Sequence, residues 1–224
     1  MTRLYLIRHC EALGNAKRLF QGTTDLDISE MGAKQLEYLK ERFSKIPLDC
    51  VYTSPLIRAR KTAEAVAYGK KIEVRECEGL KEIDGGVVEG KPFQETFAAM
   101  PELAEQWNNH PQDFAPEGGE PMRHAYERVW KAVMQIVSEN KGKNIAAATH
   151  GGLLRCLICR LQTGSIENLA SIPWSENTSV ALIEFDDELN PDLKYFNDHS
   201  HVPDEYMPKR NRLSDFMQRA GKRL

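Results

Sequence analysis

The chain has 224 residues, a formal net charge of −3, 41% hydrophobic and 28% charged residues. These values describe a globular protein that can bury a sizeable core without disulfides or a structural metal. The small net charge creates no field that favours nucleic acid or an anionic membrane as partner, and no apolar stretch approaches the length of a membrane span.

The first half of the chain alternates short apolar runs with amphipathic segments. The apolar run 4–7 predicts a buried strand that delivers the polar pair Arg8 and His9 at its C-terminal end. Ser29 is a suitable N-cap for the helix that follows the first loop. In chain order the predicted elements are a strand over 4–7, a loop over 10–27, a helix over 29–43, a strand over 50–52, a helix from 55 to about 66 and a strand over 72–74.

The second half begins with a glycine-rich loop and ends in two strands. Pro101 is expected to break the helical stretch over 93–109 into two pieces. The small-residue strand over 145–149 ends directly before His150. The predicted elements are helices over 93–109, a Pro- and Gly-rich loop over 111–121, a helix over 122–139, a strand over 145–149, a helix over 151–161, and strands over 180–185 and 194–196.

Strands that alternate with helices predict an α/β fold, a three-layer sandwich whose mostly parallel central sheet is flanked by helices. We expect one domain over residues 1–224, with a charged C-terminal tail over 199–224. Ligands of such sheets bind beyond the carboxyl ends of the strands, where Arg8, His9 and His150 are expected. The tail keeps an apolar stripe suited to docking on the body or on a second subunit, so a homodimer is one alternative. The stripe comprises Leu213, Phe216, Met217 and Ala220.

Five residues of the segments given in the next paragraph have side chains suited to phosphoryl transfer, the reaction that the family resemblance of those segments implies. This reaction needs cations around the phosphate oxygens and an in-line nucleophile. Arg8 and Arg58 each offer a planar fork that matches phosphate, and a protonated His150 would add a third donor. A neutral His9 can attack phosphorus and form phosphohistidine. Glu82 can protonate the leaving alkoxide if its surroundings raise its pKa. No metal or other cofactor is expected, because these cations supply the charge.

The segments that carry these residues are Arg8-His9-Cys-Glu, Ser54-Pro-Leu-Ile-Arg58-Ala, Leu80-Lys-Glu82-Ile-Asp-Gly and Thr149-His150-Gly-Gly. In this order they resemble the histidine phosphatase (phosphoglycerate-mutase-like) superfamily from about Leu4 to Phe185. The resemblance implies a catalytic set and a substrate-binding set, together with a helical cap insertion over about 91–121. The catalytic set is His9, Arg8, Arg58, Glu82 and His150, and the substrate-binding set is Asn15, Gln21, Gly22 and Gly151.

One position departs from the family pattern, because Cys10 stands where Gly or Ala is usual. We expect its thiol to be packed as a small hydrophobic group. No cysteine has an Arg six residues later, which excludes a cysteine-dependent phosphatase. Cys156 and Cys159 are expected in a helix core, and His199 and His201 in solvent, so no metal site is predicted. An odd number of cysteines without a signal-peptide pattern favours a cytoplasmic protein with free thiols.

The resemblance leaves three functions open: a phosphatase for a small phosphate monoester, a mutase of the phosphoglycerate type, and a non-catalytic phospho-ligand-binding module. All five catalytic positions are occupied, which disfavours the module. The stretch 92–122 contains six carboxylates and no Lys or Arg. A mutase must hold the carboxylate of its substrate, and burying that charge without a cation costs several kcal/mol. We therefore expect a phosphatase, with a neutral, aromatic or cationic leaving group. If the six acids simply face solvent, the substrate preference would be broad, but the missing cation would still argue against a mutase.

Overall fold

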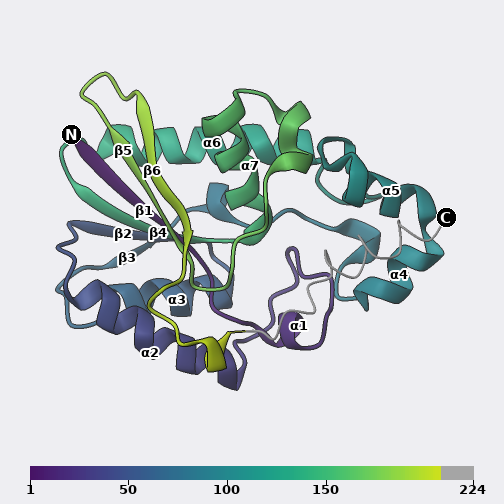
Figure 1. The fold of residues 1–224 in the computed structure, drawn as a ribbon, viewed down its shortest axis with the longest axis horizontal. Helices are drawn as coiled ribbons and strands as arrows, with labels where there is room; N and C mark the ends of the chain where they lie inside the picture. The colour runs from purple at the N-terminus through teal and green to yellow at the C-terminus, as the bar shows by residue number, and fades with distance from the viewer. Residues whose placement is uncertain (208–224) are drawn as a thin grey trace.

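The computed structural model describes residues 1–207, which form a six-stranded sheet with helices on both faces (Figure 1). The strands are β1 (Thr2–Arg8), β2 (Cys50–Thr53), β3 (Val74–Glu76), β4 (Asn144–Thr149), β5 (Val180–Phe185) and β6 (Pro191–Asp198). Their order is β3-β2-β4-β1-β5-β6. The first four are parallel, whereas β5 and β6 run antiparallel to their neighbours. The predicted α/β class with a mostly parallel sheet is confirmed.

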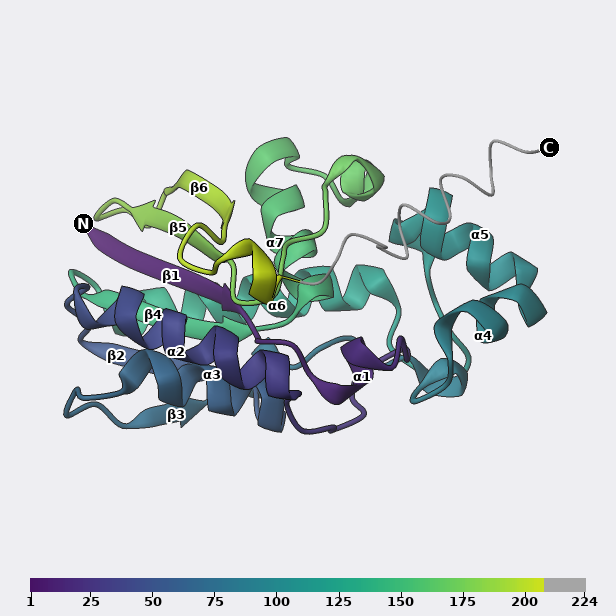
Figure 2. The same ribbon diagram turned by 60° about the horizontal axis from the view of Figure 1, so that its bottom comes forward.

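The helices are α1 (Leu13–Ala16), α2 (Glu30–Ser44), α3 (Ile57–Ala67), α4 (Phe93–Ala99), α5 (Pro101–Asn109), α6 (Met122–Glu139) and α7 (Gly151–Thr163). Helices α2 and α3 cover one face of the sheet, and α6 and α7 cover the other (Figure 2). Successive side chains of a strand point to opposite faces, so Leu6 joins the α6–α7 core and Ile7 joins the α2–α3 core. This arrangement is the predicted three-layer sandwich.

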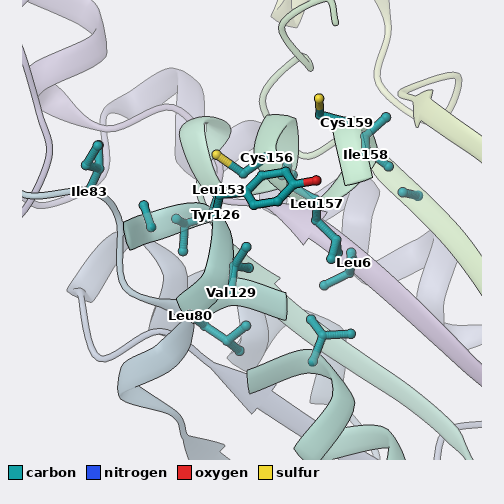
Figure 3. Packing of buried hydrophobic residues seen from close by; sticks show 14 of the residues in the cluster. Leu6, Leu80, Ile83, Tyr126, Val129, Leu153, Cys156, Leu157, Ile158 and Cys159 are labelled. Atoms are coloured by element: carbon teal, nitrogen blue, oxygen red, sulfur yellow. The ribbon is translucent and has the colours of Figure 1, made fainter. Parts of the chain in front are cut away.

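The core on the α6–α7 face is built mainly from aliphatic and small side chains (Figure 3). Tyr126 and Val129 of α6 recur on one face of the helix and pack toward Leu153 and Leu157 of α7. Leu6 brings β1 into the same cluster. Helix α7 is therefore pressed against the sheet, and its first turn is fixed at the end of β4.

Several local features differ from the sequence expectations, among them that the last strand covers 191–198 instead of 194–196. Strand β3 covers residues 74–76 instead of 72–74, because this edge strand is half exposed and shows no alternating apolar pattern. The loop over 10–27 contains α1, which is too short to show helical periodicity. Residues 166–171 form a 3₁₀ helix that was not expected. The apolar stripe predicted in the tail lies outside the described residues.

The end of the sheet where β1 and β4 terminate collects the loops that matter for function. Arg8 of β1 is opposite Thr149 of β4, so the residues that follow both strands emerge side by side. Helices α4 and α5 lie beyond this end of the sheet (Figures 1 and 2). Their junction is at Met100 and Pro101, where Pro101 begins α5, as expected. No helix within residues 1–207 is both long enough and apolar enough to cross a membrane.

Candidate active site

A cavity of about 120 Å³ opens at the ends of β1 and β4. Seven of the nine predicted site residues line it: Arg8, His9, Asn15, Gln21, Gly22, Glu82 and Gly151. The other two, Arg58 and His150, are fully buried and do not line it. The structure therefore gathers residues from five separate segments of the chain into one place.

His9 directly follows β1 and is 3% exposed. Its Nδ1 atom lies 2.6 Å from the backbone oxygen of Cys10. A carbonyl oxygen can only accept, so Nδ1 carries the proton and Nε2 keeps its lone pair. Burial, with the positive charges of Arg58 and Arg8 nearby, holds the pKa of His9 well below its usual value. The imidazole is therefore neutral and its free nitrogen is nucleophilic.

His150 follows β4 and is fully buried, with its ring centroid 5.0 Å from that of His9. Its Nε2 atom lies 2.7 Å from the hydroxyl oxygen of Ser54, and its buried Nδ1 has no hydrogen-bond partner among the described residues. Burial is the main reason that the pKa of His150 lies well below its usual value. Electrostatic interactions with Arg58, His9 and Arg8 lower it further. His150 is therefore neutral among these protein charges, and an anionic ligand would favour the protonated donor expected from the sequence.

Arg58 lies in α3 and orders the loop that contains Gly22 and Thr24. Its guanidinium donates to the backbone oxygens of Thr24 at 2.9 Å and of Gly22 at 2.6 Å. Its Nε atom is buried with no hydrogen-bond partner in the described part of the chain. Burial lowers the pKa of Arg58 to about 10. Arg8, at the end of β1, donates to the backbone oxygen of Ser175. Two guanidinium groups are thus held near His9.

Glu82 approaches His9 from the loop after β3 and meets the first turn of α7. Its carboxylate accepts the backbone N–H of Gly152 at 2.9 Å and that of Ile83 at 3.0 Å. Burial raises the pKa of Glu82, although these two hydrogen bonds and the charges of Arg58 and Arg8 oppose the increase. The structure therefore provides the raised pKa that a general acid needs.

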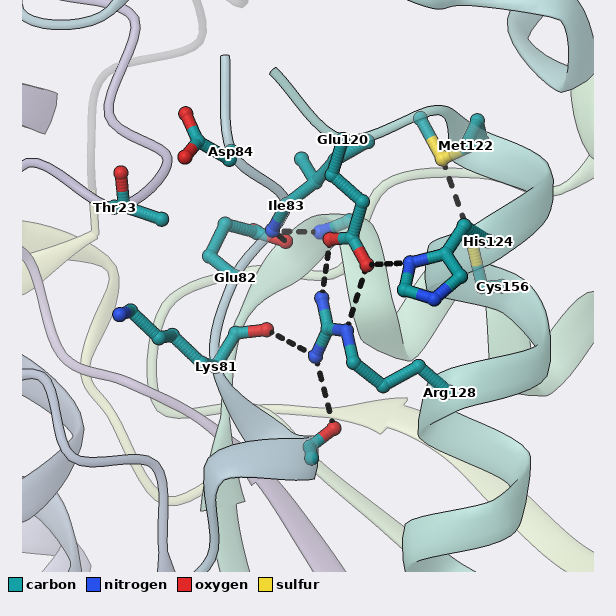
Figure 4. A network of polar contacts seen from close by, with 12 residues as sticks. Thr23, Lys81, Glu82, Ile83, Asp84, Glu120, Met122, His124, Arg128 and Cys156 are labelled. Carbon is teal, nitrogen blue, oxygen red and sulfur yellow. Dashed lines mark hydrogen bonds and ion pairs between the residues drawn. The ribbon is translucent and has the colours of Figure 1, made fainter. Parts of the chain in front are cut away.

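An ion pair that sequence reasoning missed fixes this loop (Figure 4). Arg128 of α6 binds both carboxylate oxygens of Glu120, at 2.8 and 2.5 Å. The same guanidinium donates to the backbone oxygens of Gly79 at 3.0 Å and Lys81 at 2.8 Å. The backbone immediately before Glu82 is thereby tied to the long helix. An arginine in the middle of an amphipathic helix gives no sequence signal for such a role.

The predicted substrate-binding residues have different local roles. Gly22 must lack a side chain, because a Cβ atom there would lie 2.1 Å from both the Ile83 oxygen and a Glu89 oxygen. Both amide atoms of Gln21 are buried and have no hydrogen-bond partner among the described residues. The Asn15 oxygen accepts the backbone N–H of Ala12 at 3.0 Å, which orders α1.

Aromatic residues line the rest of the cavity and were not identified as site residues from the sequence. Phe93 and Trp107 come from α4 and α5, Phe20 from the first loop, and Trp174 from the segment before β5. Strand β5 is antiparallel to β1, so the segment that precedes it arrives at the site. None of the six carboxylates of 92–122 lines the cavity, so this stretch presents aromatic rings to it.

None of the cysteines and none of the remaining histidines lines the cavity. Cys10 is buried, as expected, and burial raises the pKa of its thiol to about 12. Cys156 and Cys159 are buried in α7, also as expected. His201 is only partly exposed and its Nδ1 lies 3.1 Å from an Arg42 nitrogen, so it is less solvated than expected. Within residues 1–207, no three His, Cys, Asp or Glu side chains cluster as metal ligands would.

The sequence and the fold of this chain are both similar to those of known proteins. The chain is 30% identical over 210 residues to phosphoserine phosphatase 1 of Hydrogenobacter thermophilus. The aligned region covers 92% of this chain and 97% of that protein. It is 33% identical over 168 residues to the metal-independent phosphoserine phosphatase of Arabidopsis thaliana, covering 74% and 71% of the two chains.

The structure of Bacillus stearothermophilus YhfR superposes with a TM-score of 0.86 at 32% identity, over 91% of this chain and 100% of that one. The model of the histidine phosphatase superfamily (branch 1) matches residues 4–199. The match therefore spans both strand ends, the two histidines and the Glu82 loop. The chain belongs to the histidine phosphatase superfamily.

Proposed function

We propose that the protein hydrolyses a small phosphate monoester through a phosphohistidine intermediate on His9. The observation that carries this proposal is the pairing of opposite pKa shifts in one cavity. His9 is held neutral with a free Nε2, while burial raises the pKa of Glu82. These shifts are in the directions that a nucleophile and a general acid need.

In the first step, the lone pair of His9 Nε2 attacks phosphorus and the bond to the ester oxygen breaks. Glu82 gives its proton to the departing alkoxide, which leaves as an alcohol. In the second step Glu82, now a carboxylate, takes a proton from water, and the hydroxide oxygen displaces His9 to release phosphate. Arg8, Arg58 and a His150 protonated in the presence of phosphate stabilise the charge on the three equatorial oxygens.

The size of the cavity and the relatives both support a small substrate. A volume of about 120 Å³ leaves room for a phosphoryl group and a small leaving group, but not for folded protein or duplex nucleic acid. Two of the relatives are named phosphoserine phosphatases, and phosphoserine is a small phosphorylated molecule. We propose that neither nucleic acid nor a membrane is a partner of this protein. All five cysteines are free, which supports a cytoplasmic location.

A phosphoglycerate-type mutase is the alternative, and the charges around the cavity count against it. We propose that residues 91–121 act as a cap, with Phe93 and Trp107 as its contribution to the cavity wall. At the margins of this cap, Lys91 is exposed, and Arg123 is bound to Asp113 and Glu167 at 2.8 and 2.5 Å. Neither lines the cavity, so neither is placed to hold a second carboxylate there.

The covalent step is tested by quenching the enzyme rapidly during turnover and measuring intact mass and phosphopeptides. We expect phosphate on His9 that is lost in acid. His9→Ala should abolish both the adduct and turnover, whereas His110→Ala, an exposed histidine, should keep both. Turnover by His9→Ala near the wild-type rate would refute the mechanism.

The choice between phosphatase and mutase is tested with 3-phosphoglycerate, by following phosphate release and 2-phosphoglycerate formation in the same reaction. We expect phosphate release to exceed interconversion. Interconversion faster by orders of magnitude would establish the mutase.

A further inference from the structure

The side chains that line the cavity fall into two chemical groups. The polar group is assigned to phosphoryl transfer. The other group, called the apolar wall below, contains only uncharged side chains. These are Leu19, Phe20, Ile83, Phe93, Trp107 and Trp174. With the polar group engaged by the phosphoryl group, the apolar wall is left to contact the leaving group of a substrate.

Two tryptophans of the apolar wall contact each other. The rings of Trp107 and Trp174 stack with centroids 5.5 Å apart and an interplanar angle of 28°. Phe20 and Phe114 both meet Trp107 edge-on, with centroids at 5.3 and 4.8 Å. Both tryptophans are only partly buried, so part of each ring surface remains available to a ligand. Each of these rings therefore packs against at least one other aromatic ring.

The charges near this wall disfavour an ionic leaving group. Arg8, His9 and Glu82 are the titratable side chains among the described residues that line the cavity, and all three serve the phosphoryl group. Within the described chain, a carboxylate on the leaving group would pair with no lining cation other than Arg8, which is assigned to the phosphoryl group. Arg155 lies 5.0 Å from the Trp174 ring centroid, but it does not line the cavity and it donates to the backbone oxygens of Ile172 and Ala170. Its positive charge disfavours an ammonium group at the same ring.

We propose that the Trp107–Trp174 wall selects monoesters with a neutral aromatic leaving group, in preference to phosphoserine or other zwitterionic esters. This inference rests on the proposed phosphatase function and specifies its substrate class. A flat ring makes close contact with indole surfaces at little conformational cost, and it loses no ionic hydration on entering.

The test compares kcat/KM for benzyl phosphate, O-phosphoserine and phosphoethanolamine. All three release a primary alkoxide, so the bond-breaking step is similar and recognition decides the differences. We expect benzyl phosphate to be preferred at least about 10-fold over both others, since apolar contacts of this kind discriminate by roughly 10–200-fold. A preference for phosphoserine would overturn the inference.

Matched tryptophan variants identify the wall as the cause. Trp107→Leu and Trp174→Leu should each lower kcat/KM for benzyl phosphate about 10-fold or more, while phosphoserine changes less than about 3-fold. Trp130→Leu is the control, because Trp130 lies in α6 against Arg160 and does not line the cavity. Equal losses on all three substrates would show a structural role and overturn the assignment.

A binding measurement separates recognition from chemistry. His9→Ala should bind benzyl phosphate more tightly than phosphoserine and quench the emission of Trp107 and Trp174. Tight phosphoserine binding with no such quenching would contradict the inference and leave the phosphatase function standing. If no ester is hydrolysed and no phosphohistidine forms, the proposed function itself fails, and the specificity inference fails with it.

Discussion

The role of Glu82 leads to a quantitative prediction about leaving groups. Glu82→Gln keeps the side-chain shape and one oxygen that can accept from Gly152 or Ile83, but it removes the proton. A positioned general acid contributes about 10²–10⁴-fold to the rate, which is about 2.7–5.4 kcal/mol of transition-state stabilisation. We expect a loss of this size in kcat/KM for alkyl phosphates. p-Nitrophenyl phosphate, whose leaving group needs little protonation, should lose less than about 10-fold.

The pH dependence gives an independent readout of the same group. Glu82 must be protonated to act as the acid, and burial raises its pKa. The kcat/KM for alkyl phosphates should therefore fall as the pH rises through that raised pKa, and Glu82→Gln should remove this limb of the profile. His9 must be neutral, and its lowered pKa keeps it so well into the acid range.

A neighbouring carboxylate serves as the control. Asp84 accepts the backbone N–H of Gly86 at 2.8 Å, a turn contact, so Asp84→Asn should alter neither the leaving-group dependence nor the alkaline limb. The reasoning about Glu82 would be refuted if Glu82→Gln slowed alkyl and p-nitrophenyl phosphates equally. It would also be refuted if Asp84→Asn, but not Glu82→Gln, removed the alkaline limb.

Two further predictions concern metals and acid stability. Excess chelator should leave turnover unchanged, because the proposed mechanism uses only protein cations; activity lost on chelation and restored by a divalent ion would contradict it. Burial, aided by Arg42, lowers the pKa of His201 to about 4, so the unfolded chain binds the proton more readily than the folded one. The free energy of unfolding should therefore decrease as the pH falls from about 6.5 to 4, and His201→Gln should flatten this part of the urea-unfolding profile; an unchanged slope would show that His201 does not contribute.

The sequence alone determined the strand that carries Arg8 and His9, the strand before His150, and the α/β class. These elements are local, and their apolar periodicity is strong enough to be read directly. Helix α6 shows this most clearly, since its predicted range of 122–139 is the observed one. Most motif residues were also visible in the sequence because they stand beside a strand end or a glycine turn, and Arg58 was visible through its Ser-Pro-Leu-Ile-Arg-Ala segment.

Only the tertiary structure decided how the cavity is closed and how its groups are held. Trp174 reaches the cavity because β5 is antiparallel to β1, an orientation that no local pattern encodes. Arg128 supports the Glu82 loop through carbonyl groups about 50 residues away, at separations of 49 and 47 residues. The pKa shifts of His9 and Glu82 arise from burial and from charges on other elements. Such properties depend on distances in space between segments remote in sequence, which is why they appear only in the folded chain.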